Sequence, residues 1–498
     1  MKKFLFIILL AGALSGWNNN SKPVFPKESP ASFEEIGSID IGGQGAAEIT
    51  AFDPITRRLF VVNNTGPNKI DVLDFSNPAS MRIIADINIS SLGLVNSLAV
   101  SEGKLAAAVE AQNKQDNGCV IIYDTKSLAE IKQIMVGALP DMICYSADGN
   151  FIVTANEGEP SVDYTNDPLG TVSIISVRDN YSVKTLDFNA YNKQAYALKE
   201  KGLRIFGPGA SVAQDFEPEY ITVSPDSKTA WVTLQENNAI ARINLQSKTI
   251  TGIFPLGYKD FSQGTNGIDP SDADGIEELR AVKTYGMYQP DAIANLEIKG
   301  IPYLFTVNEG DPREYEAFVE SKRVGVIDFD KVVFQDAPVL KEKANLGRLN
   351  ITTSQGDTDG DGDYDELYSF GARSFSVWNG NTGELLFDSK NELEKKIIAA
   401  GIYDDKRSDD KGVEPEGIAL GNVGNKIIAF VGLERVDAVA LYDVTNPGNP
   451  QFLQILKTGD APEGILFIPA LQSPTGKSLL VVSSEGDGVI KVFSPQSL

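Results

Sequence analysis

The apolar residues of this chain fall into short runs of strand length, and a polar residue introduces most of them. An acidic or amide residue stands just before an apolar strand in seven places along the sequence. Each time, a second apolar strand ends in Glu or Asn, fourteen to twenty-two residues after the first polar residue. The first positions are Glu48, Asn96, Asp141, Glu219, Asp291, Glu416 and Glu463, and the second are Asn64, Glu110, Glu157, Glu236, Glu309, Glu434 and Glu485.

A third strand usually follows these two, and often a fourth. Four short antiparallel strands repeated at about 45 residues are typical of the blades of a β-propeller. Seven copies predict a single seven-bladed all-β propeller over residues 33–498, and an eight-bladed propeller is the alternative. The last repeat ends after three strands. The strand predicted at Phe33–Ile41 can supply the missing outer strand, which would close the ring and leave no open edge.

Antiparallel pairing determines where the polar positions lie. The start of a first strand and the end of a second strand meet at the same end of a blade. The repeats therefore predict two concentric rings, mostly of carboxylates, around the mouth of one tunnel. Any one of these residues is explained as well by a cap on a blade turn. Their convergence as a set favours an electronegative mouth that attracts cations.

Five longer connections are expected on the same acidic face, where loops on a rigid scaffold often carry function. They are Glu159–Gly170, Tyr191–Phe216, Tyr258–Gln289, Gly310–Lys322 and Asn391–Val413. The third strand of the fifth repeat is predicted at Arg323–Phe329. Within an irregular insertion at about residues 330–413, Arg373–Trp378 and Glu384–Asp388 predict a hairpin around Asn379-Gly380-Asn381. The irregular span is either an embellished outer blade or a partial eighth blade.

The insertion contains the densest acidic run of the chain. The carboxylates are Asp357, Asp359, Asp361, Asp363, Asp365 and Glu366. The spacing D-x-D-x-D-G resembles an EF-hand loop with Gly362 at the turn, and such oxygen ligands suit Ca²⁺. Tyr368 stands where an EF-hand has its bidentate Glu, and no flanking helices are evident. We interpret the run as a calcium loop in another context, although another divalent metal also fits; a solvated acidic loop is the alternative.

Other charged or reactive residues carry weaker signals. Asp272 and Asp274 form a possible second metal loop or an ordinary Asx turn. Three arginines near acidic segments, at 313, 323 and 373, are expected to balance neighbouring carboxylates rather than to hold a phosphate. Cys119 and Cys144 lie in apolar runs and are expected to be buried free thiols rather than a disulfide.

Composition excludes several classes of function. The chain has 498 residues, a formal net charge of −24 and no histidine. The negative charge argues against nucleic acid and anionic membranes as partners. Without histidine there is no His-based catalytic triad and no His-ligated zinc.

The N-terminus has the features of an export signal. Lys2-Lys3 precede the apolar run Phe4–Leu14, which predicts a signal peptide over residues 1–16 and a linker over 17–32. Leu14-Ser15-Gly16 resembles a bacterial lipobox, but Trp17 replaces the lipidated Cys. We therefore expect an exported protein in the periplasm, at the cell surface or secreted. No later stretch is long enough for a transmembrane helix.

Several motifs resemble those of one family. They are N-E-G-E-P at 156–160, Y-x-P-D-A-I-A at 288–294, V-N-E-G-D at 307–311, G-D-T-D-G-D-G-D-Y-D-E at 356–366, F-G-A-R-S-F-S-V-W at 370–378 and E-P-E-G-I at 414–418. Together they resemble the choice-of-anchor I propellers of bacterial exported proteins. Some relatives are named after a mesenchyme-specific cell surface glycoprotein and others are labelled alkaline phosphatase. The resemblance implies a cell-surface propeller with a variable anchor, and no settled activity.

Two functions remain open at this point. The first is a calcium-binding surface module that binds other cell-surface or outer-membrane proteins, or a small ligand, on its acidic face. The alternative is a metal-dependent phosphoester hydrolase of the alkaline phosphatase or phytase type, with metals orienting the water. The sequence shows no basic cluster for a polyanionic substrate, and it identifies no catalytic residue.

Overall fold

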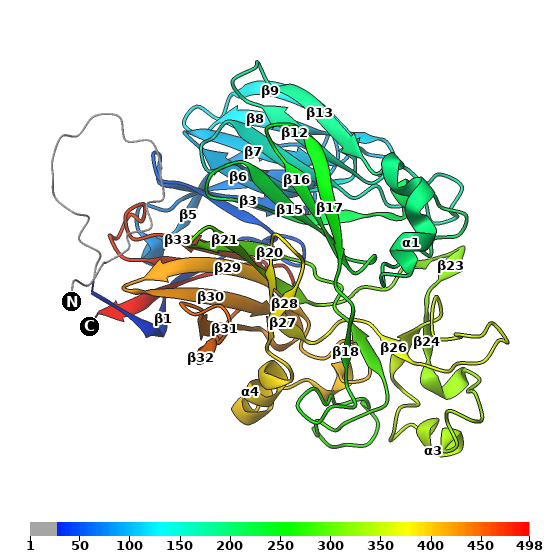
Figure 1. Ribbon diagram of the computed structural model, residues 1–498. Coiled ribbons are helices and arrows are strands. Elements are labelled where there is room, and N and C mark those ends of the chain that lie inside the picture. Colours follow the sequence, from blue (N-terminus) through cyan, green and yellow to red (C-terminus); the bar gives the residue numbers. More distant parts are fainter. Residues whose placement is uncertain (1–26, 498) are drawn as a thin grey trace, which may run out of the picture.

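The computed structural model describes residues 27–497, which form a ring of small antiparallel sheets (Figure 1). Seven of the sheets have four strands. The first four follow chain order: β2 (Thr50–Asp53), β3 (Arg58–Asn63), β4 (Lys69–Asp74) and β5 (Arg82–Asn88); β6 (Val95–Ser101), β7 (Lys104–Val109), β8 (Asn117–Asp124) and β9 (Glu130–Ala138); β10 (Pro140–Tyr145), β11 (Phe151–Asn156), β12 (Thr171–Ser176) and β13 (Ser182–Asp187); and β14 (Pro218–Val223), β15 (Thr229–Leu234), β16 (Ala239–Asn244) and β17 (Thr249–Pro255).

The remaining three sheets are less regular in sequence. The fifth contains β20 (Ile293–Ile298), β21 (Ile301–Asn308), β27 (Ser374–Asn379) and β28 (Leu385–Asp388). The sixth contains β29 (Pro415–Val423), β30 (Lys426–Leu433), β31 (Ala438–Asp443) and β32 (Gln451–Lys457). The seventh contains β33 (Pro462–Ile468), β34 (Leu479–Ser484), β35 (Val489–Ser497) and β1 (Glu28–Asp40).

The N-terminal strand closes the ring. β1 pairs antiparallel with β35, with Glu34 opposite Ser494 and Ile39 opposite Ile490. In Figure 1 the blue N-terminal strand accordingly lies beside the red C-terminal strand. This pairing confirms the outer strand that the sequence predicts at Phe33–Ile41. The signal peptide predicted over residues 1–16 lies outside the described residues.

The hydrophobic core is divided among the interfaces between neighbouring sheets. Seven apolar clusters each join two successive four-stranded sheets, and one of them lies between the seventh sheet and the first. Phe52 and Leu59 of the first sheet, for example, pack with Leu479 and Val481 of the seventh. The middle strands read as continuous apolar runs because neighbouring sheets cover both of their faces, and β3 and β7 are almost fully buried. This closed, face-to-face packing of four-stranded sheets is the architecture of a β-propeller.

The predicted third strand of the fifth repeat is wrong. Arg323 ends the short strand β24 (Ser321–Arg323), which pairs with β25 (Asn350–Thr352) outside the ring. β27 takes its place beside β21, and β28 completes the hairpin that the sequence predicts around Asn379-Gly380-Asn381. Arg323–Phe329 is apolar because Val324, Ile327 and Phe329 pack in a separate cluster of the insertion. Periodicity alone does not distinguish that cluster from a blade interface.

The insertions gather beyond one end of the ring, on the right of Figure 1. They contain a three-stranded sheet and two two-stranded sheets, so the described part of the insertion forms no eighth four-stranded sheet. Their strands are β18 (Tyr258–Asp260), β19 (Tyr285–Met287) and β26 (Tyr368–Ser369); β22 (Glu314–Tyr315) and β23 (Phe318–Val319); and β24 with β25. The α-helices are α1 (Ala195–Lys199), α2 (Val212–Asp215), α3 (Ala337–Leu340) and α4 (Glu392–Ala400). None of the described helices is long and apolar enough to cross a membrane.

Candidate functional site

Strand register brings the two polar positions of each repeat to the same end of its sheet. In the third sheet, Pro140 at the start of β10 lies opposite Asn156 at the end of β11. The next residue, Glu157, donates its backbone N–H to the Leu139 carbonyl at 2.8 Å. Glu434 and Glu485 make the same contact in the sixth and seventh sheets, to the carbonyls of Glu414 and Ala461, at 3.0 Å. The predicted convergence of the polar positions at one end of each sheet is therefore present.

The residue before the first-strand proline has a shared and unusual backbone. Leu139, Gln289, Glu414 and Ala461 have φ values of 48°, 40°, 48° and 52°. A non-glycine residue in the left-handed region is strained, and a following proline restricts it further. The surrounding packing maintains this conformation in four repeats. Each such residue turns the chain so that the acidic residue two positions later lies at or just before the start of the inner strand.

The carboxylates meet in two compact groups at this end, which we call the acidic mouth. One oxygen each of Glu157, Glu219 and Glu236 lies within 4.8 Å of the other two. In the second group, Glu309 lies within the same distance of two pairs, Asp291 with Glu416 and Glu414 with Glu434. A cavity of about 150 Å³ beside the second group is lined by Glu416, Glu434, Glu463 and Glu485.

Burial and mutual repulsion raise the pKa values of these carboxyl groups. The pKa of Glu48 rises to about 8, first because it is buried and then because of the Glu485 charge. Burial, followed by the Glu309 charge, raises the pKa of Glu434 to about 7. Burial, followed by the Glu48 charge, raises the pKa of Glu463 well above its usual range. Closely spaced buried carboxylates stay ionised only if a cation compensates them.

The amide positions and one lysine moderate the negative charge. Asn64 donates its side-chain N–H to Glu48 at 2.9 Å, so an amide replaces one carboxylate of the ring in the first repeat. Lys411 pairs with Glu309 and, at 3.2 Å, with Glu414. Both carboxylates raise the pKa of Lys411 well above its ordinary value, although burial alone would lower it. Lys411 therefore supplies one of the positive charges that the second group requires.

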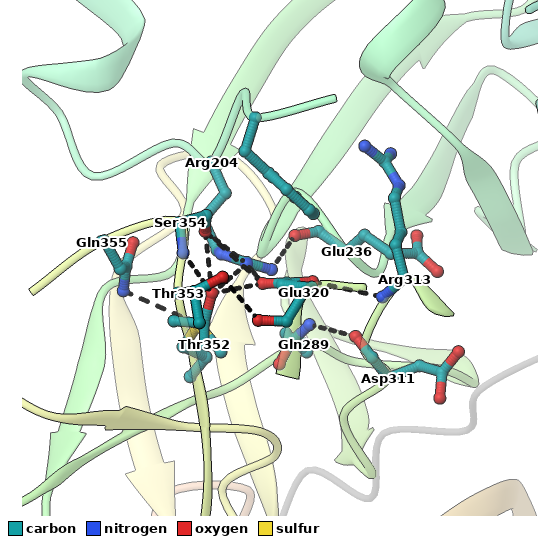
Figure 2. Close-up of polar contacts among 12 residues, drawn as sticks. Arg204, Glu236, Gln289, Asp311, Arg313, Glu320, Thr352, Thr353, Ser354 and Gln355 are labelled. Atoms are coloured by element: carbon teal, nitrogen blue, oxygen red, sulfur yellow. Dashed lines mark hydrogen bonds and ion pairs between the residues drawn. The ribbon is translucent and has the colours of Figure 1, made fainter. Parts of the chain in front are cut away.

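The insertions build a polar wall beside the mouth, shown in Figure 2. Arg204 is almost fully buried, forms an ion pair with Glu320 and donates to the Glu236 carbonyl at 2.6 Å. Ser354 also accepts from Arg204, at 3.1 Å. Farther along the wall, the Gln289 side-chain N–H donates to the Asp311 carbonyl at 2.7 Å. These contacts connect three segments that are distant in sequence and fix them against the end of β15.

A second buried arginine and a group of aromatic rings complete this wall. Arg313 forms ion pairs with Asp215 at 2.7 Å and Glu217 at 2.8 Å. The Phe206 ring lies between the two guanidinium groups, with centroid distances of 4.2 Å to Arg204 and 4.5 Å to Arg313. Desolvated cation–π pairs of this kind add to the ion pairs in stabilising the wall.

The Asp-rich loop is exposed and lies in the outer part of the insertion. Asp357 accepts the backbone N–H groups of Gly360 and Gly362 at 2.7 and 3.0 Å. One oxygen each of Asp357, Asp359 and Asp361 lies within 4.8 Å of the other two, and Asp363 and Asp365 form a similar group with Asp330. These hydrogen bonds order the turn of the loop. The donor set consists of oxygen atoms only, which suits a hard cation.

The end of the loop departs from an EF-hand. The Tyr368 hydroxyl donates to the Glu366 carboxylate, so Glu366 points toward the β26 strand that follows it. Asp365 instead accepts from Thr358 at 2.7 Å, which closes the loop. The Thr358 hydrogen bonds lower the pKa of Asp365. A calcium site in this loop remains a prediction.

The weaker sequence signals lie among hydrogen bonds and ion pairs. Asp272 pairs with Arg348 at 2.7 Å, and Asp274 pairs with Arg280 at 3.1 Å. Asp274 also accepts the Ile276 N–H, which is the Asx turn given as the alternative to a second metal loop. Arg323 pairs with Asp409, and Arg373 pairs with Glu394 at 3.3 Å.

The charge-balance interpretation of Arg313, Arg323 and Arg373 is confirmed by these pairs. The two cysteines are free thiols, as expected; Cys119 is buried and Cys144 half-buried. Burial raises the pKa of Cys144 to about 12, so its thiol is unreactive at neutral pH.

Comparison with known proteins places this fold in a family. A family model described as the Choice-of-anchor I domain matches residues 48–447. The chain belongs to the choice-of-anchor I family. The match begins at Glu48, the first acidic position of the mouth, and extends into the sixth sheet. The family resemblance suggested by the sequence motifs is thereby confirmed.

Two curated proteins are similar to this family member. Gigasin-3a from Magallana gigas is 30% identical over 195 residues, which cover 32% of this chain and 68% of that protein. Mesenchyme-specific cell surface glycoprotein from Strongylocentrotus purpuratus is 27% identical over 345 residues, which cover 58% of this chain and 44% of that protein. The chain thus spans less than half the length of the second relative.

Solved structures similar to this family member include two chains matched over almost their full length. A chain of Kuenenia stuttgartiensis hydrazine synthase has a TM-score of 0.49 and 12% identity, and the match covers 91% of this chain and 97% of that one. The Myceliophteria thermophila Cps50 (Swd1) β-propeller domain has a TM-score of 0.46 and 9% identity, with 93% and 100% covered.

Sequence reasoning missed the residues that come from insertions. Lys411, Asp215 and Glu320 do not belong to the repeat, and nothing in their local sequence indicates burial beside the mouth. Glu217 and Glu414 have a recognisable signal. They precede the first-strand prolines of E-P-E-Y-I and E-P-E-G-I, at the position where other repeats have Leu139, Gln289 or Ala461.

Proposed function

We propose that this chain is an exported, seven-bladed β-propeller of the cell surface that binds a partner at its acidic mouth. The observation that carries the proposal is the convergence of carboxylates from many repeats on one end of the ring. The wall built by the insertions lies beside the same end. Family membership and the printed name of the Strongylocentrotus purpuratus relative support a surface location.

The partner is expected to carry positive charge. Clefts lined by one sign of charge attract the opposite sign and accelerate encounter, more strongly at low ionic strength. The proposed partners are therefore a basic patch on another cell-surface or outer-membrane protein, or a small cationic ligand. The buried carboxylates provide the attraction, while the loops supply the shape that selects the partner.

Calcium has a structural role in this proposal. We assign it to Asp357, Asp359, Asp361, Asp363 and Asp365, where one ion would neutralise the closely spaced charges and order the loop. Glu366 bonds to Tyr368 and is less suited as a ligand. Support comes from the grouping of oxygens around the turn.

A phosphoester hydrolase is the less favoured function. A phosphate substrate would need a cation beside the metal, and the three arginines that could provide one are paired with carboxylates. No observation assigns a nucleophile or a general base. Assays of phosphatase activity with added Ca²⁺, Mn²⁺ and Fe test this alternative directly.

Site-specific photo-cross-linking in cells of the source organism tests the binding proposal. A photoreactive residue is placed at Glu434 of the mouth or at Glu159, two residues after the mouth residue Glu157. Matched variants carry it at Asp148 or Asp226, in turns at the opposite end of the sheets. The mouth positions are expected to capture a defined partner. The yield of this cross-linking should fall when Glu434 is neutralised or when the salt concentration is raised. Equal cross-linking from both ends, or from neither, would contradict the proposal.

A further inference from the structure

The two carboxylate groups of the acidic mouth differ in how their charge is compensated. The group around Glu309 contains the Lys411 ammonium, which pairs with Glu309 and Glu414. The group of Glu157, Glu219 and Glu236 forms no ion pair with any residue that the structure describes. The Glu309 group therefore contains an ion-paired ammonium, whereas the group of Glu157, Glu219 and Glu236 contains no ion-paired cation among the described residues.

The group of Glu157, Glu219 and Glu236 also has unsatisfied oxygen atoms. Glu236 is 5% exposed, and neither its Oε2 nor the Oε2 of Glu219 has a hydrogen-bond partner among the described residues. Buried polar atoms normally have partners, and a buried carboxylate oxygen without one is costly. These two oxygen atoms are therefore available to coordinate a cation.

The neighbouring arginines are already paired with other carboxylates. Arg313 pairs with Asp215 and Glu217, and Arg204 pairs with Glu320. Their geometry fixes them in the wall, and neither makes an ion pair with Glu236. Neither arginine can take the role that Lys411 has in the Glu309 group without breaking an existing pair.

We propose that Glu157, Glu219 and Glu236 bind one hard divalent cation, such as Ca²⁺, between the third and fourth sheets. Glu157 follows β11 of the third sheet, whereas Glu219 lies in β14 and Glu236 follows β15 of the fourth. The ion would join two blades at the rim of the tunnel, in the way that Lys411 joins β29 to the end of β21. This site is separate from the Asp-rich loop and does not depend on the proposed partner.

The geometry and the chemistry of the donors suit such an ion. Protein oxygens bind Ca²⁺ at about 2.3–2.6 Å, so oxygens around one ion lie up to about 5 Å apart. The three carboxylate oxygens here lie within 4.8 Å of one another. All three donors are oxygen, which selects Ca²⁺, Mn²⁺ or Mg²⁺ over metals that prefer nitrogen or sulfur. Water would fill the remaining positions on the open side of the mouth.

The experiment separates this site from the Asp-rich loop. A loop variant, Asp357→Asn with Asp359→Asn and Asp361→Asn, removes the calcium site proposed there. Equilibrium dialysis with metal analysis then counts bound Ca²⁺, and Mn²⁺ electron paramagnetic resonance reports an ion held by protein oxygens. The loop variant is expected to retain one cation per chain. Adding Glu219→Gln and Glu236→Gln is expected to weaken binding by about a hundredfold or more.

A matched control removes one charge from the ring without touching the group. Glu110→Gln changes a buried ring carboxylate of the second sheet, and it is expected to leave the stoichiometry unchanged in the loop variant. If the loop variant binds neither Ca²⁺ nor Mn²⁺ at millimolar concentration, the proposal is wrong. Equal binding by the loop variant with and without the two extra substitutions would overturn it as well.

A separate single substitution tests the site even if the double variant fails to fold. Glu236→Lys would bring an ammonium into the group, as Lys411 does in the Glu309 group. In the loop variant it is expected to abolish cation binding and to remove the rise in melting temperature that Ca²⁺ produces. Retention of a Ca²⁺-dependent rise in melting temperature would contradict the assignment of this ligand.

Discussion

Lys411 forms an ion pair with Glu309, which lies 102 positions earlier in the chain, and both side chains are largely removed from solvent. The lysine belongs to the connection before β29, and the glutamate follows β21. The pair therefore joins the fifth and sixth sheets at the acidic mouth. Glu414, which accepts a second ion pair from Lys411, is fully buried.

Replacing this lysine is expected to destabilise the protein strongly. Lys411→Met would leave Glu309 and Glu414 buried with one fewer compensating charge, and breaking a buried pair in this way costs about 3–5 kcal/mol. Chemical denaturation measures the loss. Millimolar Ca²⁺ is expected to recover part of it, because a divalent ion can replace the ammonium.

A surface pair provides the control for the lysine substitution. Lys426→Met removes an ion pair with Asp443 from a side chain that is 40% exposed. Exposed pairs contribute about 0–1 kcal/mol. Similar losses in the two variants would show that Lys411 has no special role at the mouth.

The sequence predicts the scaffold well because its signals are local and repeated. Each polar position adjoins its own apolar strand, and β-pairing needs only neighbouring strands of one repeat. Phe33–Ile41 was recognisable as the closing strand because the last repeat lacks one. The third strand of the fifth repeat was misplaced because the insertion has its own apolar cluster, around Phe329 and Leu349, with the same kind of apolar run.

The chemistry of the mouth was only half predictable. Repeat positions such as Glu236 and Glu416 follow from the pattern, and so does their convergence. Compensation of the negative charges depends on Lys411 and on the ion pairs of Arg313. Both residues lie in insertions, so the repeat pattern does not predict their positions. Long-range contacts of this kind depend on how loops fold back, and a single sequence contains no local signal for that.

The raised pKa of Glu48 predicts a stability that falls as pH rises. Its pKa in the folded protein is about 8, above the ordinary 4.5, so the folded state retains a proton that the unfolded chain releases. The resulting stabilisation is fully present below about pH 4.5 and is lost as pH rises through 8. Glu48→Gln keeps an acceptor for Asn64 and carries no charge. It is expected to match wild type at pH 4.5 and to be more stable by about 2–4 kcal/mol at pH 9.

Urea denaturation of both proteins across this pH range provides the measurement. Glu102→Gln, in an exposed turn between β6 and β7, is the control and should follow the wild-type curve. A constant difference between wild type and Glu48→Gln at all pH values would mean that Glu48 does not titrate in this window.

Closure by β1 predicts the effect of shortening the N-terminus. Deleting residues 1–42 would expose the edge of β35, whose N–H and C=O groups would then be free to pair with another chain. The product is expected to aggregate, whereas deletion of residues 1–26 should leave a monomer. Size-exclusion chromatography with light scattering distinguishes them. A monomeric 1–42 deletion that melts like the parent would contradict closure by this strand.

The Asp-rich loop predicts that stability depends on calcium. Asp357, Asp359 and Asp361 gather their oxygens within 4.8 Å, and repulsion between the exposed carboxylates favours a bound cation. An ion that binds only the folded state adds about 2.7 kcal/mol at a hundredfold excess over its dissociation constant. Chelation is therefore expected to lower the melting temperature and to make residues 330–390 sensitive to protease while the sheets of the ring persist.

Asp359→Ala with Asp361→Ala should reproduce that pattern and remove most of the further response of this span to chelator. Scanning calorimetry measures the melting temperature, and limited proteolysis measures cleavage of the span. The carboxylates of the acidic mouth are intact in this variant and serve as the internal reference. If the 330–390 span of wild type is cleaved equally fast in chelator and in millimolar Ca²⁺, the run is a solvated acidic loop and its hydrogen bonds alone maintain its shape.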